Sequence, residues 1–510
     1  MHRGSCRSAA NSMMTQGEMM ITDSQMKQGM AEPAPLRLRH RILQAGGWAG
    51  AGFVLDKVIA AIQLMVVARL LSPADFGVMA ASATIVLAFM TISELGVEST
   101  LIAKPEVDRE DLAVAWTLAI ARGVAMAACL WATADVIGQV MQMPQLASLL
   151  RVHAWLLVLQ GLQSPAMALV AKSLNLRLRV TMDLVRRVIE AGAIVALALW
   201  LRNVWALLLG QLLGMCVGSI LSFWVAPFKP RLSLYGPARE YFWGYGKHLN
   251  VTTLCIFVVM SGGELIIGRI LGQDSLGLYQ IALAIPLLLG VRATVLIHQI
   301  SMPTYAWLQR DRPGVIRVFE LQMGLVGFMF IPLAAAVAVF APVIVPLAFG
   351  PQWLAIVDPL RVLCLYAVCA GYSSVMTALH YGANRPDLQM KSWIGQCLFY
   401  ALAIVPLTMR FGLTGAAAAL VASYLVGLLL QGIGTRDLIG TAVDAVYWST
   451  GRACLIGGAL AGVILLMSGA TSATPSSWVL AAACLGAGGL YSGYLWMVEV
   501  PRMKVLWEHR

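Results

Sequence analysis

The chain has 510 residues, of which 59% are hydrophobic and only 12% charged, and its mean hydropathy is +0.77. Soluble proteins carry roughly a quarter charged residues, so this composition excludes an ordinary soluble protein and predicts a membrane protein. The formal net charge is +11, but the basic residues are spread over many short loops, which excludes a basic patch for nucleic acid.

The first segment, residues 1–40, is rich in Met, Ser and Gln and has no apolar run long enough for a signal peptide. We expect it to be a disordered cytoplasmic extension. The nine cysteines are scattered, without a CxxC pair or a CxxC…HxxxH spacing. The sequence therefore predicts no metal site, no disulfide framework and no cofactor.

Fourteen apolar segments follow, and most are long enough to cross a hydrocarbon core of about 30 Å. They predict an all-α polytopic membrane protein with about 14 transmembrane helices. The segments are 45–70, 76–102, 112–138, 147–171, 181–201, 203–226, 246–270, 276–299, 318–348, 355–380, 392–409, 413–433, 450–469 and 477–498.

Lys and Arg orient these segments, because cytoplasmic loops carry the excess of positive charge. With the N-terminus inside, nearly all basic loop residues fall on the inner side through all fourteen segments. We therefore expect both termini in the cytoplasm, including the tail 501–510. Every loop on the outer side is short, so the sequence predicts no exterior domain that could house a catalytic site.

A near-repeat divides the chain. Residues Ala68–Val78 read ARLLSPADFGV and residues Gly268–Leu278 read GRILGQDSLGL, so that Arg69 matches Arg269 at an offset of two hundred residues. Each copy joins two apolar segments. Such duplication is typical of transporters built from two similar halves.

The repeat predicts two lobes of six helices, residues 41–228 and residues 229–436. Six is an even number, so the two lobes keep the same orientation and form parallel repeats. Residues 437–500 then form an extra C-terminal helix pair. This pair carries no Asp, Glu, Lys or Arg from Ala453 to Val498, which favours contact with lipid.

Charged residues deep in the membrane cost about 2.5–3.5 kcal/mol and normally face protein or water. Asp56 and Lys57 lie in the first segment, Arg122 in the third and Arg292 in the eighth. We expect these four residues to line a central cavity that binds an anionic headgroup, because the guanidinium of Arg donates paired hydrogen bonds to phosphate.

Two carboxylates, Glu94 and Glu264, also lie within apolar segments. Either they pair with these cations or they bind a coupling H⁺ or Na⁺. The alternative for the whole set is a group of internal ion pairs that fix helix packing. Glu190, Arg186 and Arg187 are assigned to structure and topology.

The stretches ARLLSPADFGVMAASATIV and GRILGQDSLGLYQIALAIP resemble the first-to-second and seventh-to-eighth helix junctions of bacterial oligosaccharide flippases. These are the Wzx-type polysaccharide exporters of the multidrug/oligosaccharidyl-lipid/polysaccharide (MOP) superfamily. The resemblance implies two MATE-like lobes around a cationic cavity that opens alternately to each side. It also implies that the last two helices form a groove for a lipid tail.

The resemblance further implies a function: flipping undecaprenyl-pyrophosphate-linked oligosaccharide repeat units across the bacterial inner membrane, for exopolysaccharide, O-antigen lipopolysaccharide or capsule. The expected partners are the polyprenyl-pyrophosphate-linked oligosaccharide and membrane lipid. Coupling to H⁺ or Na⁺ and a complex with polymerase or export proteins stay open.

Two alternatives remain at this point. A cation-coupled multidrug exporter of the same superfamily typically has twelve helices, so the extra pair argues against it. A membrane polysaccharide polymerase or ligase usually carries a large exterior loop, which this chain lacks. The sequence therefore predicts a transporter and not an enzyme.

Overall fold

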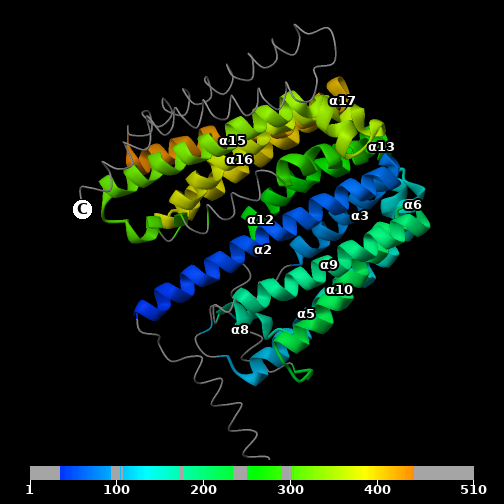
Figure 1. Cartoon of the computed structure of the whole chain (residues 1–510), viewed down its shortest axis with the longest axis horizontal. Coiled ribbons are helices and arrows are strands. Elements are labelled where there is room, and N and C mark those ends of the chain that lie inside the picture. Colours follow the sequence, from blue (N-terminus) through cyan, green and yellow to red (C-terminus); the bar gives the residue numbers. More distant parts are fainter. Residues whose placement is uncertain are drawn as a thin grey trace, which may run out of the picture.

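The computed structural model describes residues 35–93, 101, 104, 107–172, 176–233, 250–288, 298, 301–302 and 304–440. In this part of the chain the regular structure is helical, and the helices run side by side in one bundle (Figure 1). Eight of these helices are long and apolar enough to cross a membrane. The predicted all-helical membrane protein is thus confirmed. Most of the extra pair, from residue 441 on, and most of the N-terminal extension lie outside the described residues.

The first half contains five long helices and one interrupted segment. The long helices are α2 (Pro35–Leu70), α3 (Pro73–Ile92), α5 (Arg109–Met141), α9 (Leu176–Leu201) and α10 (Trp205–Val225). The interrupted segment consists of α6 (Pro144–His153), α7 (Trp155–Gly161) and α8 (Met167–Lys172). The sequence predicted one helix over 147–171 here. Pro165 lacks a backbone N–H, which disfavours an unbroken helix through the gap between α7 and α8.

The second half begins with α12 (Asn250–Phe257), the π-helix η1 (Val258–Gly262) and α13 (Gly263–Pro286). It continues with α15 (Arg312–Ala348), the 3₁₀ helix η3 (Pro351–Ile356), α16 (Val357–Gly382) and α17 (Pro386–Ile439). Two of these helices bend sharply at glycines with positive φ, α13 at Gly272 (φ 84°) and α17 at Gly412 (φ 60°). Both bends lie between consecutive apolar segments of the sequence.

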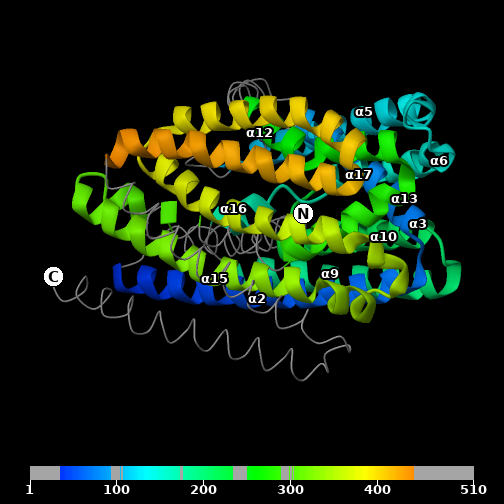
Figure 2. The same cartoon turned by 90° about the horizontal axis from the view of Figure 1, so that it is seen from above.

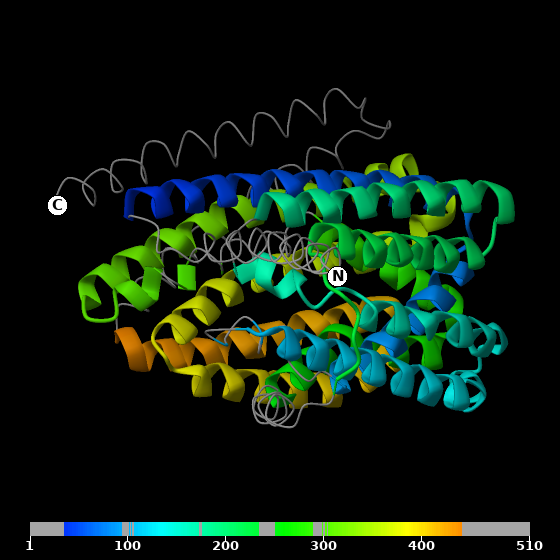
Figure 3. The same ribbon diagram turned by 90° about the horizontal axis from the view of Figure 1, so that it is seen from below.

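Helices within each half pack closely. In the first half, α9 packs along both α2 and α10, and α2 and α9 lie side by side (Figure 3). In the second half, α16 packs along both α15 and α17 (Figure 2). The apolar core is shared between the halves, since one buried cluster includes Val78 and Leu150 together with Ile281 and Trp353.

The start of α3 is set by a capping box. Ser72 Oγ accepts a hydrogen bond from the Asp75 backbone N–H (3.3 Å), and Asp75 Oδ2 accepts one from the Ser72 N–H (3.0 Å). Pro73 occupies the first turn, where its missing N–H costs nothing. The second carboxylate oxygen of Asp75 accepts from the N–H of Val204 (3.0 Å), which joins the start of α3 to the start of α10. The repeated segment is therefore anchored locally.

The two halves meet where α3 crosses α13, and the contact is between backbones. A Cβ atom added to Gly77 would lie 1.8 Å from the carbonyl oxygen of Gln273. A Cβ atom added to Gly277 would lie 1.8 Å from the carbonyl oxygen of Pro73. Only glycine permits this approach, because no side-chain movement can relieve a clash with backbone. We call this end of the bundle, which contains both repeat copies, the junction end.

We expect Gly77→Ala to destabilise the protein by about 1–3 kcal/mol, because the added methyl group forces α3 away from α13. Gly192→Ala is the matched control, since nothing lies within 4 Å of a Cβ there. Thermal unfolding of the purified protein in detergent measures both variants. An equal melting temperature for the two would contradict the close contact of α3 and α13.

Candidate functional site: a charge cluster and a carboxylate between the halves

Five charged residues on α2 and α9 form one cluster inside the bundle. The Asp56 carboxylate pairs with Lys57 Nζ and lies 3.6 Å from Arg187 Nε. Glu190 pairs with two guanidinium groups, Arg187 Nη1 at 3.0 Å and Arg186 Nη1 at 2.9 Å. Because Asp56 and Glu190 share Arg187, the charges of the two helices form one connected network.

The cluster contains three cations and two anions, so it keeps one net positive charge. Its carboxylate Glu190 is buried, with a side chain 10% exposed, whereas the side chains of Lys57, Arg186 and Asp56 are 19%, 32% and 34% exposed. The anions thus hold the cations in place, and the cations retain access to a ligand. A partly accessible group of this kind can bind an anion such as phosphate.

Helix α10 makes room for the cluster through two glycines. A Cβ atom added to Gly214 would lie 2.6 Å from Glu190 Cβ, and one added to Gly218 would lie 2.6 Å from Arg186 Cδ. The small residues let α10 approach α9 at the level of the charges. The cluster is therefore shielded by protein on this side, as charged groups in a membrane require.

The structure places Asp56 and Lys57 with residues that the sequence analysis assigned to structure and topology. Arg186 and Arg187 precede Glu190 on α9 by four and three residues, spacings that bring each arginine next to Glu190, and these three residues complete the cluster. Their spacing was visible in the sequence. Their contact with Asp56, more than 120 residues earlier, was not.

The structure does not place the other predicted residues in this cluster. Arg122 is half-buried on α5, which packs mainly against α6 and α7, whereas the cluster lies on α2 and α9. Arg292 and Glu94 lie outside the described residues. The assignment of Arg122 and Arg292 to the cavity, and of Glu94 to ion coupling or ion pairing, stays a prediction.

Glu264 lies at the contact between the halves. It is buried on α13 and accepts a hydrogen bond from Thr84 Oγ1 of α3. The π-helix η1 directly precedes it, and π-helical turns occur frequently at functional sites. The hydroxyl of buried Tyr400 lies against the neighbouring Gly263, since a Cβ there would come within 1.9 Å of it. A titratable group thus connects one half to the other.

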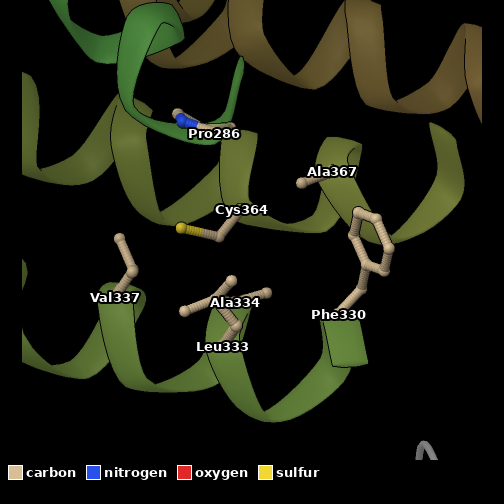
Figure 4. Close-up of a pocket in the computed structure, with 7 residues that line it drawn as sticks. All are labelled: Pro286, Phe330, Leu333, Ala334, Val337, Cys364 and Ala367. Carbon is tan, nitrogen blue, oxygen red and sulfur yellow. The ribbon is translucent and has the colours of Figure 1, made fainter. Parts of the chain in front are cut away.

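A third feature is an apolar pocket between α13, α15 and α16. Its lining residues are Pro286, Phe330, Leu333, Ala334, Val337, Cys364 and Ala367 (Figure 4). None of them carries a charge, so this pocket is unsuited to a headgroup. In the described part of the chain no three His, Cys, Asp or Glu side chains gather as metal ligands.

We expect Glu190→Ala to destabilise the protein by about 3–5 kcal/mol, because it leaves Arg186 and Arg187 without their shared carboxylate. Asp387→Asn is the control: it breaks a pair with Arg385 (2.9 Å) in which both side chains are more than 40% exposed, and should leave the melting temperature nearly unchanged. Thermal unfolding in detergent compares the two variants. Similar losses would show that the cluster does not stabilise the α2–α9 contact.

Known proteins are similar to this chain in sequence and in fold. A family model described as polysaccharide biosynthesis protein matches residues 66–358. The chain is 22% identical over 380 residues to the lipopolysaccharide biosynthesis protein WzxC of Escherichia coli (strain K12), covering 72% of this chain and 76% of WzxC.

Two solved structures show the fold. The lipid II flippase MurJ in an inward closed conformation superposes with a TM-score of 0.75 at 11% identity, covering 88% of this chain and 99% of MurJ. An inward-facing MATE-family multidrug resistance transporter of the MOP superfamily gives a TM-score of 0.57 at 16% identity, covering 77% and 94%. The resemblance seen in the two junction sequences is thus confirmed. The chain is a multi-pass membrane protein that belongs to the family of polysaccharide biosynthesis proteins, and its fold is similar to that of these two transporters.

Proposed function

We propose that this protein is a flippase that moves undecaprenyl-pyrophosphate-linked oligosaccharide repeat units across the bacterial inner membrane by alternating access. The observation that carries the proposal is the net-positive cluster of α2 and α9, placed inside a fold shared with a lipid flippase. A pyrophosphate headgroup needs cations inside the membrane, and this cluster offers three.

The chemistry of the cluster fits a pyrophosphate. Arg187 and Arg186 present planar guanidinium groups that match phosphate oxygens, and Lys57 adds a compact charge. Arg122 and Arg292 are proposed as further cations along the path. The sugars occupy the polar cleft while the polyprenyl tail stays in lipid beside residues 437–500. The transmembrane potential favours outward movement of an anion by about 2.3 kcal/mol per charge per 100 mV.

Transport, not catalysis, is the proposed activity. The loops on the predicted exterior are too short to build a catalytic domain. The proposed orientation places both termini in the cytoplasm, in agreement with the distribution of Lys and Arg. Glycosyl transfer by the purified protein, or drug hypersensitivity of a deletion strain, would instead support a polymerase or a multidrug exporter.

Coupling to an ion is proposed at Glu264. A buried carboxylate becomes costly when it ionises, unless it meets water or a cation. Separation of the halves would break its bond from Thr84 and expose it. Proton or Na⁺ binding at Glu264 and closure of the halves are therefore linked, so that an ion gradient can drive the cycle.

Lys57→Gln should lower translocation about tenfold, the effect of losing one charge-assisted hydrogen bond to the headgroup. Translocation of lipid-linked oligosaccharide in proteoliposomes measures it. Arg361→Gln is the control, because Arg361 pairs with exposed Asp358 outside the cluster. Wild-type rates for Lys57→Gln, and also for an Arg122→Ala, Arg292→Ala double variant, at normal protein levels would overturn the assignment of the headgroup site.

Glu264→Gln should translocate at a rate that no longer responds to an imposed pH or Na⁺ gradient, since the amide oxygen still accepts from Thr84 but the side chain does not titrate. Thr84→Ala is the control: it loses the hydrogen bond, keeps the carboxylate and should keep the response. Initial rates in proteoliposomes with and without each gradient make the comparison. A full gradient response in Glu264→Gln would place the coupling site elsewhere.

A further inference from the structure

The repeated arginines make the same kind of contact, each across to the opposite half. At the end of α2, Arg69 Nε donates to the carbonyl of Ala348 (3.2 Å), and its Nη2 donates to the carbonyl of Leu347. These are among the last carbonyls of α15. Carbonyls at a helix C-terminus have no partner in the helix and carry partial negative charge, so a cation stabilises them.

Two hundred residues later, Arg269 on α13 repeats this contact in the opposite direction. Its Nη1 donates to Gln142 Oε1 (3.1 Å). Gln142 is the residue that ends α5, where the backbone turns with φ 56°. Helix α5 is the third apolar segment of the first half, and α15 is the third of the second half. Each arginine thus reaches the end of the third helix of the other half.

The backbone contacts between the halves show the same reciprocity. Gly77 faces the carbonyl of Gln273, and Gly277 faces the carbonyl of Pro73. Gly77 and Gly277 are two hundred positions apart, and so are Pro73 and Gln273, so each contact joins the same two matched positions from opposite halves. Contacts that exchange in this way are those of two similar surfaces related by a two-fold axis.

A buried aromatic side chain also joins the two halves at the junction end. Trp353, which follows α15, is fully buried and packs edge to face against Phe76 at a ring distance of 5.4 Å. Its Nε1 donates to the carbonyl of Ala68 (2.8 Å), and Gln352 Nε2 donates to the same carbonyl (2.9 Å). The residue before Arg69 is thereby held by the second half as well.

We propose that these contacts form a reciprocal latch, in which each repeated arginine holds the end of the third helix of the opposite half and keeps the junction end closed. Both arginines are exposed, so water can replace their protein partners and the latch can open. Its release separates α3 from α13 and opens the cleft at this end. The inference rests on the alternating access proposed above.

Spin-label distances test the latch without substrate. The nine cysteines are first replaced by alanine. Spin labels are then attached at Trp200→Cys in the first half and Met409→Cys in the second half. Both positions are highly exposed and lie near the ends of helical segments, shortly before Arg202 and Gly412, so the distance between the labels reports the separation of the halves. We expect the Arg69→Ala, Arg269→Ala double variant to raise the ratio of long to short distances about tenfold or more, because it loses three hydrogen bonds from charged groups, each of which water partly replaces.

Arg361→Ala is the matched control, because Arg361 Nε also donates to a carbonyl of α15, that of Ala338 at 3.2 Å, but within the same half. It should leave the distances unchanged. Gln142→Glu tests the latch in the opposite direction: its new carboxylate pairs with Arg269, so the short distances should increase.

The latch would be overturned if the distances did not change in Gln142→Glu and the arginine variant either showed no change or did not fold. An equal shift in Arg361→Ala would overturn it too. The outcome is separable from the proposed function. If the label distances lengthen in the arginine variant and shorten in Gln142→Glu, but the protein translocates no lipid-linked oligosaccharide, the flippase function is refuted and the latch stands. If the protein translocates the lipid but the distances do not change in either variant, the latch is refuted.

Discussion

The close approach of α3 and α13 is the contact on which the arrangement of the two halves depends. Gly77 and Gly277 bring two backbones together without intervening side chains, and Thr84 meets Glu264 on the same helix pair about 10 Å along α3. The other helices pack mainly within their own half. Breaking and remaking the contact of α3 with α13 would let the two halves move relative to one another, as the proposed alternating access requires.

The cost of charge in a membrane explains the second feature of the molecule. Asp56 and Glu190 are not isolated acids, because each is compensated by cations on α2 or α9. The same side chains would thus serve stability and the proposed binding: the carboxylates hold the cations in position, and the surplus cation leaves the cluster with a net positive charge.

Local patterns predicted much of this. Long apolar runs identified the helices, and the glycines at the bends of α13 and α17 fell between predicted segments. Asp56 and Lys57 were predicted to line a central cavity with Arg122 and Arg292; the structure shows them paired with each other and Asp56 with Arg187, and their role in the cavity stays a prediction. The interruption between α7 and α8 was missed, because mean hydropathy does not report a broken helix. The α9 members of the cluster were underestimated, because i, i+4 pairs such as Arg186 and Glu190 also occur on ordinary helix surfaces.

The sequence by itself determined that the chain is a helical membrane protein. A membrane helix satisfies its backbone polar groups internally and faces lipid with its side chains, so it is visible in the sequence as a long apolar run. It also determined the repeat, since matched residues such as Arg69 and Arg269 are visible without coordinates. Only the tertiary structure decided what those residues touch. Arg69 donates to a carbonyl 279 residues away, and Arg187 on α9 contacts Asp56 on α2. Such partners depend on how the helices pack against one another, which no local sequence pattern encodes.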